Sequence, residues 1–205
     1  MIIGITGGIG SGKSTIARCL REMGYAVYDT DSQAKRLIVE DAQVREQMEA
    51  VFGKEVYQDG VYQTHIVAEK VFGAVSDNQQ ACNKRQDLLS RLNAIVHPAV
   101  KRDILRWAKE INHAAICFVE CAILYQAGFD ELCDKVVMVT APETTRIERT
   151  IARDHSTIEK VRARIHAQDT AGDIQRADII INNDGSQSIA TLCQEIINKT
   201  IVARK

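Results

Sequence analysis

The chain has 205 residues, which suits one globular domain with room for an insertion. Its 26 Lys and Arg residues balance 27 Asp and Glu, so the overall charge gives no reason to expect binding to nucleic acid or to a membrane surface. No apolar run approaches the roughly 18 residues of a membrane span, and the six cysteines form no C-x-x-C pair. These features predict a cytoplasmic protein with reduced cysteines.

The N-terminal part of the chain predicts a strand, a glycine-rich turn and a helix. Residues 2–6 are apolar and are followed at once by a glycine cluster. The apolar spacing from residue 13 to residue 23 is helical, and Gly24 is placed to end that helix. A second short strand is predicted at residues 25–28, and two acids, Asp29 and Asp31, follow it.

The middle of the chain predicts helices and no clear strand. The helices are expected at residues 32–39, 44–52, 65–72 and 83–112. Asp59 and Gly60 mark a turn, and Pro98 is expected to end a helix at His97 because proline disfavours helical backbone in the residue before it.

The last third returns to alternating strands and helices. Strands are predicted at residues 115–119, 135–140 and 178–182, and helices at residues 142–154 and 157–168. Ser186 is expected to cap a C-terminal helix. This alternation predicts an α/β fold with a parallel five-stranded sheet, into which the helical middle is inserted.

The sequence between the first strand and the first helix matches the phosphate-binding pattern G-x-x-x-x-G-K-[ST] in full, from Gly7 to Ser14. Glycines let backbone amides converge on a phosphate, and the helix start adds partial positive charge. Lys13 would meet the β- and γ-phosphates, and Ser14 would bind Mg²⁺. The residues expected to bind the nucleotide here are Gly8, Ile9, Gly10, Ser11, Gly12, Lys13, Ser14 and Thr15.

The ordered motifs resemble those of the dephospho-CoA kinase family over essentially the whole chain. They are T-G-G-I-G-S-G-K-S-T at residues 6–15, D-x-D at 29–31, Leu92-Asn93 with His97-Pro98, Arg146, Arg149 and Arg153-Asp154, Arg164 and Gln168 on a helix, and Ala177-Asp178 with the 182–185 turn. The resemblance implies a three-layer P-loop core at residues 1–31 and 113–205, a helical CoA-binding insertion at 32–112 and a helical lid at 143–170. It also implies transfer of the γ-phosphoryl group of ATP, with Mg²⁺, to the ribose 3′-hydroxyl of dephospho-CoA.

By the same resemblance, Asp31 is the expected general base, with Asp29 beside it, and Lys13 and Arg149 serve catalysis. A carboxylate near the ribose hydroxyl can accept its proton during transfer. The alternative is that Asp31 caps the helix beginning at Ser32.

Arg146, Arg149 and Arg153 form a basic helical face that is expected to meet ATP, unless it is a solvated surface. Glu120 lies where a Walker B acid would order Mg²⁺, and Asn183 is expected in the loop beside the adenine.

The remaining substrate residues are Lys35 and His97, with Asp29, Asp31 and Glu120. Lys35 and Arg36 meet either the acceptor pyrophosphate or solvent, and His97 is either a structural residue or a ligand contact. The sequence departs from the family at Gln126, where relatives commonly carry an acid, so no charged role transfers there.

Three other functions are alternatives to this kinase activity. A GTP switch would need an N-K-x-D segment, and both Asn-Lys pairs of the chain lack the acid. A kinase for another small acceptor and a non-catalytic nucleotide-binding subunit are the other two. The oligomeric state is open, with a monomer among the options.

Overall fold

The computed structural model describes residues 1–73, 79–111, 116–168 and 171–202. The chain forms two compact units, each considered by itself. The first unit comprises Met1–Asp29 with Arg106–Lys205, and the second comprises Thr30–Leu105.

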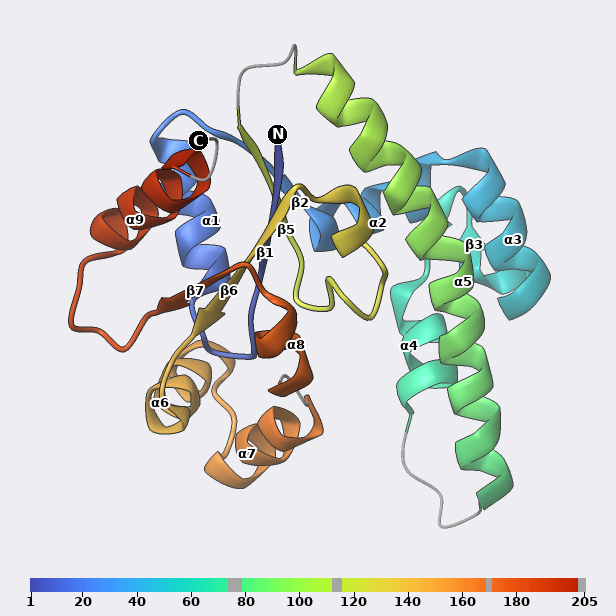
Figure 1. Cartoon of the computed structure of the whole chain (residues 1–205). Coiled ribbons are helices and arrows are strands. Elements are labelled where there is room, and N and C mark those ends of the chain that lie inside the picture. Colours follow the sequence, from blue (N-terminus) through green and yellow to red (C-terminus); the bar gives the residue numbers. More distant parts are fainter. Residues whose placement is uncertain (74–78, 112–115, 169–170, 203–205) are drawn as a thin grey trace. The chain divides into compact units, whose positions relative to one another are not determined.

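The first unit is built on a five-stranded parallel sheet (Figure 1). Its strands, in spatial order, are β2 (Ala26–Asp29), β5 (Cys117–Glu120), β1 (Ile2–Thr6), β6 (Lys135–Thr140) and β7 (Ile179–Asn182). All four strand pairings are parallel, so the carboxyl ends of the strands share one edge of the sheet. The α/β fold class and the five parallel strands predicted from the sequence are confirmed.

Five α-helices lie wholly within the described part of the first unit, besides the end of the helix that runs over Gln79–Glu110. They are α1 (Lys13–Glu22), α6 (Glu143–Asp154), α7 (Ile158–Ala167), α8 (Ala171–Arg176) and α9 (Ile189–Val202). A 3₁₀ turn, η2 (Asp130–Leu132), precedes β6.

One face of the sheet is covered by α1 and α9. Its buried cluster takes apolar side chains from β1, β5, β6, β7 and both helices: Ile3, Ile5, Ile16, Leu20, Phe118, Val137, Val139, Ile179, Ile181, Leu192, Cys193, Ile196 and Ile197. Because α1 carries the glycine-rich loop at its start, this cluster fixes where the loop leaves the sheet.

The other face packs against the segment between β5 and β6. A Cβ added to Gly4 would lie 3.0 Å from Cys133 Sγ and 3.1 Å from a methyl carbon of Leu124, so the strand and this segment are closely packed. Burial raises the pKa of the Cys133 thiol to about 12, so this cysteine behaves as a small core hydrophobe.

The sequence did not predict α8, which is fastened to the segment after β5 by polar contacts. Gln126 Nε2 donates to Asp173 at 2.9 Å. Arg176 donates to Asp130 at 2.7 Å and lies over the ring of Tyr125, with its guanidinium carbon 4.1 Å from the ring centroid. Gln126, where the family pattern has an acid, therefore holds a helix in place.

The second unit contains the helical middle of the chain: α2 (Thr30–Glu40), α3 (Ala42–Phe52), α4 (Thr64–Phe72) and most of α5 (Gln79–Glu110). A 3₁₀ turn, η1 (Lys54–Val56), leads into a hairpin of β3 (Tyr57–Gln58) and β4 (Val61–Tyr62) around the predicted turn. Strands this short carry almost no pattern, so the sequence did not reveal them. Tyr57 Oη donates to the carbonyl of Ile38 at 2.7 Å and ties the hairpin to α2.

Two boundary predictions were wrong. α5 continues through Pro98, so no helix ends at His97. The residues on either side, among them Val96, Ala99 and Val100, are buried, and this packing supports a helix that local preference would interrupt.

Ser186 does not cap α9. Ser188 Oγ accepts a hydrogen bond from the Thr191 N–H at 3.1 Å instead, while the Ser186 N–H donates to Asp184. Within the described parts of the chain, no helix has the length and apolar character needed to cross a membrane.

The core of the first unit can be tested on α9, which carries a matched pair of isoleucines. Ile196 is fully buried and Ile201 is 48% exposed. We expect Ile196→Ala to lower the free energy of unfolding by about 2–5 kcal/mol, because it removes buried methyl groups and leaves a cavity. Ile201→Ala should change it by less than about 0.5 kcal/mol. Urea unfolding followed by Trp107, the single tryptophan, measures both, and equal effects would contradict this packing.

Candidate active site

The glycine-rich loop joins β1 to α1 at the carboxyl edge of the sheet. Gly12 occupies the residue before α1 with φ 92° and ψ 12°, a left-handed conformation, and Gly10 has φ 76°. A Cβ at Gly12 would collide with Asn183 Nδ2. Glycine is therefore required at both positions, by backbone angle and by space. The first N–H groups of α1 have no partner within the helix and carry partial positive charge.

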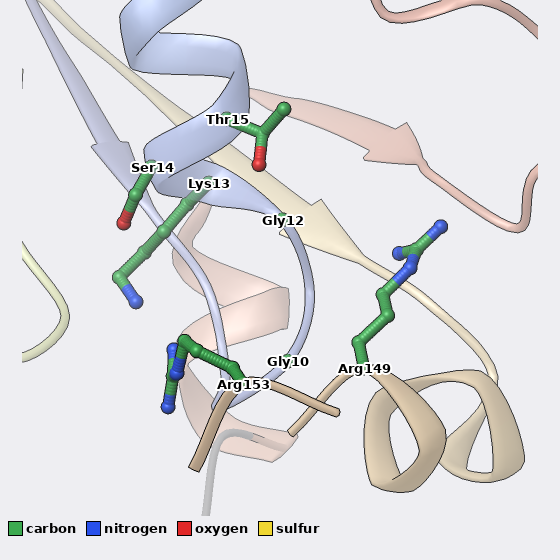
Figure 2. Close-up of a pocket in the computed structure, with 7 residues that line it drawn as sticks. All are labelled: Gly10, Gly12, Lys13, Ser14, Thr15, Arg149 and Arg153. Carbon is green, nitrogen blue, oxygen red and sulfur yellow. The ribbon is translucent and has the colours of Figure 1, made fainter. Parts of the chain in front are cut away.

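A cavity of about 380 Å³ opens beside this loop. The cavity is lined by residues from the loop, α1 and α6: Gly10, Gly12, Lys13, Ser14, Thr15, Arg149 and Arg153. Figure 2 shows these side chains around the loop. Among the described residues that line the cavity, three are cations and none is an acid, so the cavity suits a polyanion.

Asn183 supports the loop and one of these cations at the same time. It follows β7 and is 2% exposed. Its Nδ2 donates to the Ser11 carbonyl at 2.8 Å. Arg149 in turn donates to the Asn183 carbonyl at 3.0 Å and to Asn183 Oδ1 at 3.4 Å. The sequence analysis expects Asn183 in the loop beside the adenine, and this stays a prediction; in the structure its side chain bonds to the loop and to Arg149.

Arg153 is held at the cavity by Asp154. The two side chains share hydrogen bonds of 2.6 and 3.0 Å, and Arg164 of α7 donates to the same carboxylate at 2.9 Å. The hydrogen bonds from Arg153 and Arg164 hold the pKa of Asp154 well below its usual range. Asp154 is therefore ionised at neutral pH and links the ends of two helices.

Arg146 lies apart from Arg149 and Arg153, although the sequence grouped all three on one basic face. Its side chain lines a different, smaller cavity of about 90 Å³, together with Gly8 and Ser11. Burial lowers the pKa of Arg146, partly offset by the charge of Glu143.

Oxygen ligands gather at the carboxyl ends of β2 and β5. Asp29 and Glu120 are register partners on the neighbouring strands. Ser14 Oγ donates to Glu120 Oε1 at 3.1 Å, and Glu120 is buried. Across the described residues, no group of three or more His, Cys, Asp or Glu side chains could hold a metal ion by itself. A cation here would need further ligands from a substrate or from water.

The second unit contains the other predicted substrate residues, Asp31, Lys35 and His97. Asp31 and Lys35 are exposed on α2. Asp31 lies within the first turn of α2, which begins at Thr30, so it does not stand before the helix as an N-cap residue would. His97 is half-buried on α5, and burial lowers its pKa.

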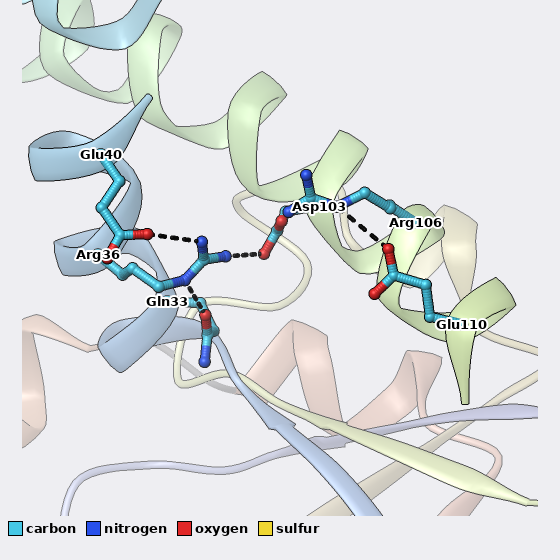
Figure 3. Close-up of polar contacts among 6 residues, drawn as sticks. All are labelled: Gln33, Arg36, Glu40, Asp103, Arg106 and Glu110. Atoms are coloured by element: carbon cyan, nitrogen blue, oxygen red, sulfur yellow. Dashed lines mark hydrogen bonds and ion pairs between the residues drawn. The ribbon is translucent and has the colours of Figure 1, made fainter. Parts of the chain in front are cut away.

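Arg36 is fully engaged inside the second unit (Figure 3). It donates to Gln33 at 2.6 Å, to Glu40 at 3.1 Å and to the buried Asp103 at 2.6 Å. Burial lowers the pKa of Arg36, but the hydrogen bonds to Asp103 and Glu40 outweigh this and leave it above its ordinary value. Arg36 therefore joins α2 to α5, and Lys35 remains the exposed cation of the pair.

Replacing Asn183 tests how the loop is supported. We expect Asn183→Ala to lower the free energy of unfolding by about 1–3 kcal/mol, because the buried Ser11 carbonyl loses its hydrogen-bond donor. Asn182→Ala is the matched control, since Asn182 is exposed, and it should change the free energy by less than about 0.5 kcal/mol. Urea unfolding followed by Trp107 checks both. Equal stability of the two variants would show that the Asn183 contact contributes nothing.

Comparison with known proteins agrees with this geometry. A family model described as dephospho-CoA kinase matches residues 1–188. The chain is 39% identical to a dephospho-CoA kinase of Porphyromonas gingivalis over 175 residues, covering 85% of this chain and 81% of that one. It is 38% identical to a dephospho-CoA kinase of Salinibacter ruber, covering 90% and 89% of the two chains.

Among solved structures, TT1252 from Thermus thermophilus superposes with a TM-score of 0.76 at 31% sequence identity, covering 99% of this chain and 96% of that one. The family model spans most of the sequence, and relatives above 30% identity cover most of both chains. The chain therefore belongs to the dephospho-CoA kinase family.

Proposed function

We propose how this site performs the reaction that family membership assigns to the chain, the ATP-dependent phosphorylation of dephospho-CoA in coenzyme A synthesis. The observation that carries the proposal is the cavity in which the glycine-rich loop meets Lys13, Arg149 and Arg153. Phosphoryl transfer depends mainly on positioning and on charge stabilisation. A cavity lined by loop residues and three cations supplies both.

The ATP triphosphate lies along the residues from Gly8 to Thr15. The loop amides and the start of α1 bind its phosphate oxygens. Lys13 and Arg149 balance the charge that develops on the transferred group, and Arg153 adds a further cation. Asn183 bonds to both Ser11 and Arg149, and so fixes the position of the loop relative to this arginine.

Asp31 acts as the general base for the ribose 3′-hydroxyl, and Asp29 lies two residues before it in the chain. A carboxylate accepts the hydroxyl proton while the oxygen attacks the γ-phosphorus and the bond to ADP breaks. Asp31 is exposed in the first turn of α2, where an acceptor hydroxyl can reach it.

The donor set beside the loop fits Mg²⁺. Ser14 Oγ and the Glu120 carboxylate lie 3.1 Å apart, and Mg²⁺ commonly takes few protein oxygens while keeping waters and substrate phosphates. Ser14 would hold the ion directly and Glu120 through water. An ion held by these residues would supply positive charge against the phosphates of ATP.

We assign dephospho-CoA binding to the helical second unit, with Lys35 and His97 as contacts. Lys35 is an exposed cation suited to the acceptor pyrophosphate, and α5 presents His97 half-buried. The nucleotide core would comprise residues 1–31 and 113–205, and the lid residues 143–170. A cytoplasmic location suits a chain whose cysteines carry no disulfide.

The direct test is ATP consumption with and without dephospho-CoA, with the product identified by mass. We expect turnover that depends on dephospho-CoA and a product heavier by one phosphoryl group on the ribose. ATP consumption that is indifferent to dephospho-CoA would refute the acceptor assignment.

Asp31→Asn tests the general base. We expect kcat to fall by about 10²–10⁴-fold with ATP binding nearly unchanged, because the amide cannot accept the hydroxyl proton. Asp41→Asn is a matched control in the same unit: Asp41 caps α3, a role asparagine also fills, so turnover should persist. Lys13→Ala should instead abolish most ATP binding. Normal kcat in Asp31→Asn would assign the base elsewhere.

Glu120→Gln tests the metal environment. The Mg²⁺ concentration for half-maximal activity should rise by about tenfold or more, because the amide keeps the size of the side chain but loses the charge that orients the metal-bound waters. Glu148→Gln, on the exposed side of α6, should leave the Mg²⁺ dependence unchanged. A Glu120→Gln enzyme with a wild-type Mg²⁺ titration would remove Glu120 from the site.

A further inference from the structure

Ile9, in the phosphate loop, is held from both ends of the segment that runs through α6 and α7. Its carbonyl accepts a hydrogen bond from Arg146 Nε at 2.8 Å. Its N–H donates to Gln168 Oε1, also at 2.8 Å. Arg146 lies in the first turns of α6, and Gln168 directly follows α7. The two peptide groups that flank one loop residue are therefore fixed by side chains 22 positions apart, at residues 146 and 168.

The side chain of Ile9 is bound to the same two helices. It packs against a buried cluster formed by Ile147 of α6 and by Val161 and Ile165 of α7. These polar and apolar contacts of Ile9 thus lead to one segment. A loop rich in glycine has few side chains of its own with which to define a shape, so these external contacts determine where the loop lies.

The neighbouring glycines show how closely Arg146 supports the loop. A Cβ at Gly8 would collide with Arg146 Nη2, and a Cβ at Gly10 would collide with the Arg146 carbonyl. Arg146 does not line the cavity that holds Lys13, Arg149 and Arg153. Its guanidinium is directed at the Ile9 carbonyl of the loop backbone rather than into that cavity.

Gln168, like Arg146, bonds to the loop backbone without lining the cavity. Its Oε1 receives the Ile9 N–H, its Nε2 donates weakly to the Ala122 carbonyl at 3.5 Å, and it is absent from the lining of the cavity. A backbone N–H can be satisfied by any acceptor, so the requirement is for an acceptor oxygen at this point.

We infer that Gln168, together with Arg146, is a positioning residue of the phosphate loop: the two side chains clamp Ile9 so that the loop amides face the nucleotide, without touching it. The inference rests on the proposal that this loop binds ATP. It predicts that the identity of atom Oε1 of residue 168 sets nucleotide affinity.

The test compares two substitutions at residue 168. Gln168→Met keeps the length of the side chain and removes the acceptor, and it should raise the Kd for Mg·ADP and the KM for ATP about three- to tenfold, as for the loss of one hydrogen bond. Gln168→Glu keeps an acceptor oxygen, so its Kd for Mg·ADP and its KM for ATP should stay within about twofold of the wild-type values. The KM for dephospho-CoA should not change in either variant.

Gln126→Met is the matched control. Gln126 also uses its amide between segments, but it donates to Asp173 rather than to the loop, so the Kd for Mg·ADP should stay within about twofold of wild type. A general loss of packing would affect both Gln→Met variants, whereas loss of the clamp affects only Gln168→Met.

Amide hydrogen exchange of the wild-type protein gives a measurement that needs no variant. The Ile9 N–H should exchange slowly without nucleotide, because it is bonded to Gln168, and an unprotected rate would overturn the inference. An unchanged Kd in Gln168→Met, or equal losses in Gln168→Met and Gln168→Glu, would overturn it too. A wild-type protein that binds Mg·ADP but does not phosphorylate dephospho-CoA would refute the proposed function. The Kd values for Mg·ADP of the variants would still test the clamp.

Discussion

The site depends on one constraint: a loop that binds phosphate through its backbone and is rich in glycine has few side chains of its own with which to fix its shape. Gly10 and Gly12 adopt left-handed backbone angles, and both approach neighbouring groups too closely for a Cβ. The conformational freedom that permits this path also costs entropy when the loop becomes ordered. Partners outside the loop must therefore supply the interactions that hold it.

Those partners come from three directions. The buried cluster between the sheet, α1 and α9 fixes both ends of the loop. Asn183, after β7, binds the Ser11 carbonyl near the start of α1. Arg146 and Gln168 bind the peptide groups of Ile9 on the other side of the loop. Asn183 also accepts a hydrogen bond from Arg149. The same residue therefore supports the loop and one cation of the cavity.

The sequence predicted most of the fold because the strands and helices carry local patterns. The strands at residues 2–6 and 135–140 were predicted with the bounds the structure has. The phosphate loop was equally visible, since its chemistry lies in consecutive residues. The hairpin of β3 and β4 was missed because two-residue strands have no periodicity, and Pro98 was misread because burial of α5 overrides the local preference of proline.

The supports of the loop could not be predicted in the same way. Asn183 and Ser11 are 172 positions apart, and Gln168 and Ile9 are 159 apart. A side-chain amide that bonds to a distant backbone group leaves no spacing or charge pattern in the sequence. Arg146 was misgrouped for the same reason: helical periodicity places it near Arg149 and Arg153, but only the tertiary structure shows that its guanidinium turns to the loop.

The positions of these supports also bear on how the α6–α7 segment can move. Arg146 near its start and Gln168 at its end both hold Ile9, and Ile147, Val161 and Ile165 pack on the same residue. For the lid proposed at residues 143–170, a closure that keeps these contacts would have to bend at the turn that joins the two helices. Arg153 and Asp154 end α6 at this turn, and Asp154 also accepts a hydrogen bond from Arg164 in the last turn of α7. Ion pairs exposed to water are weak and easily exchanged, so Arg153 could exchange its bond with Asp154 for one with a phosphate at little cost.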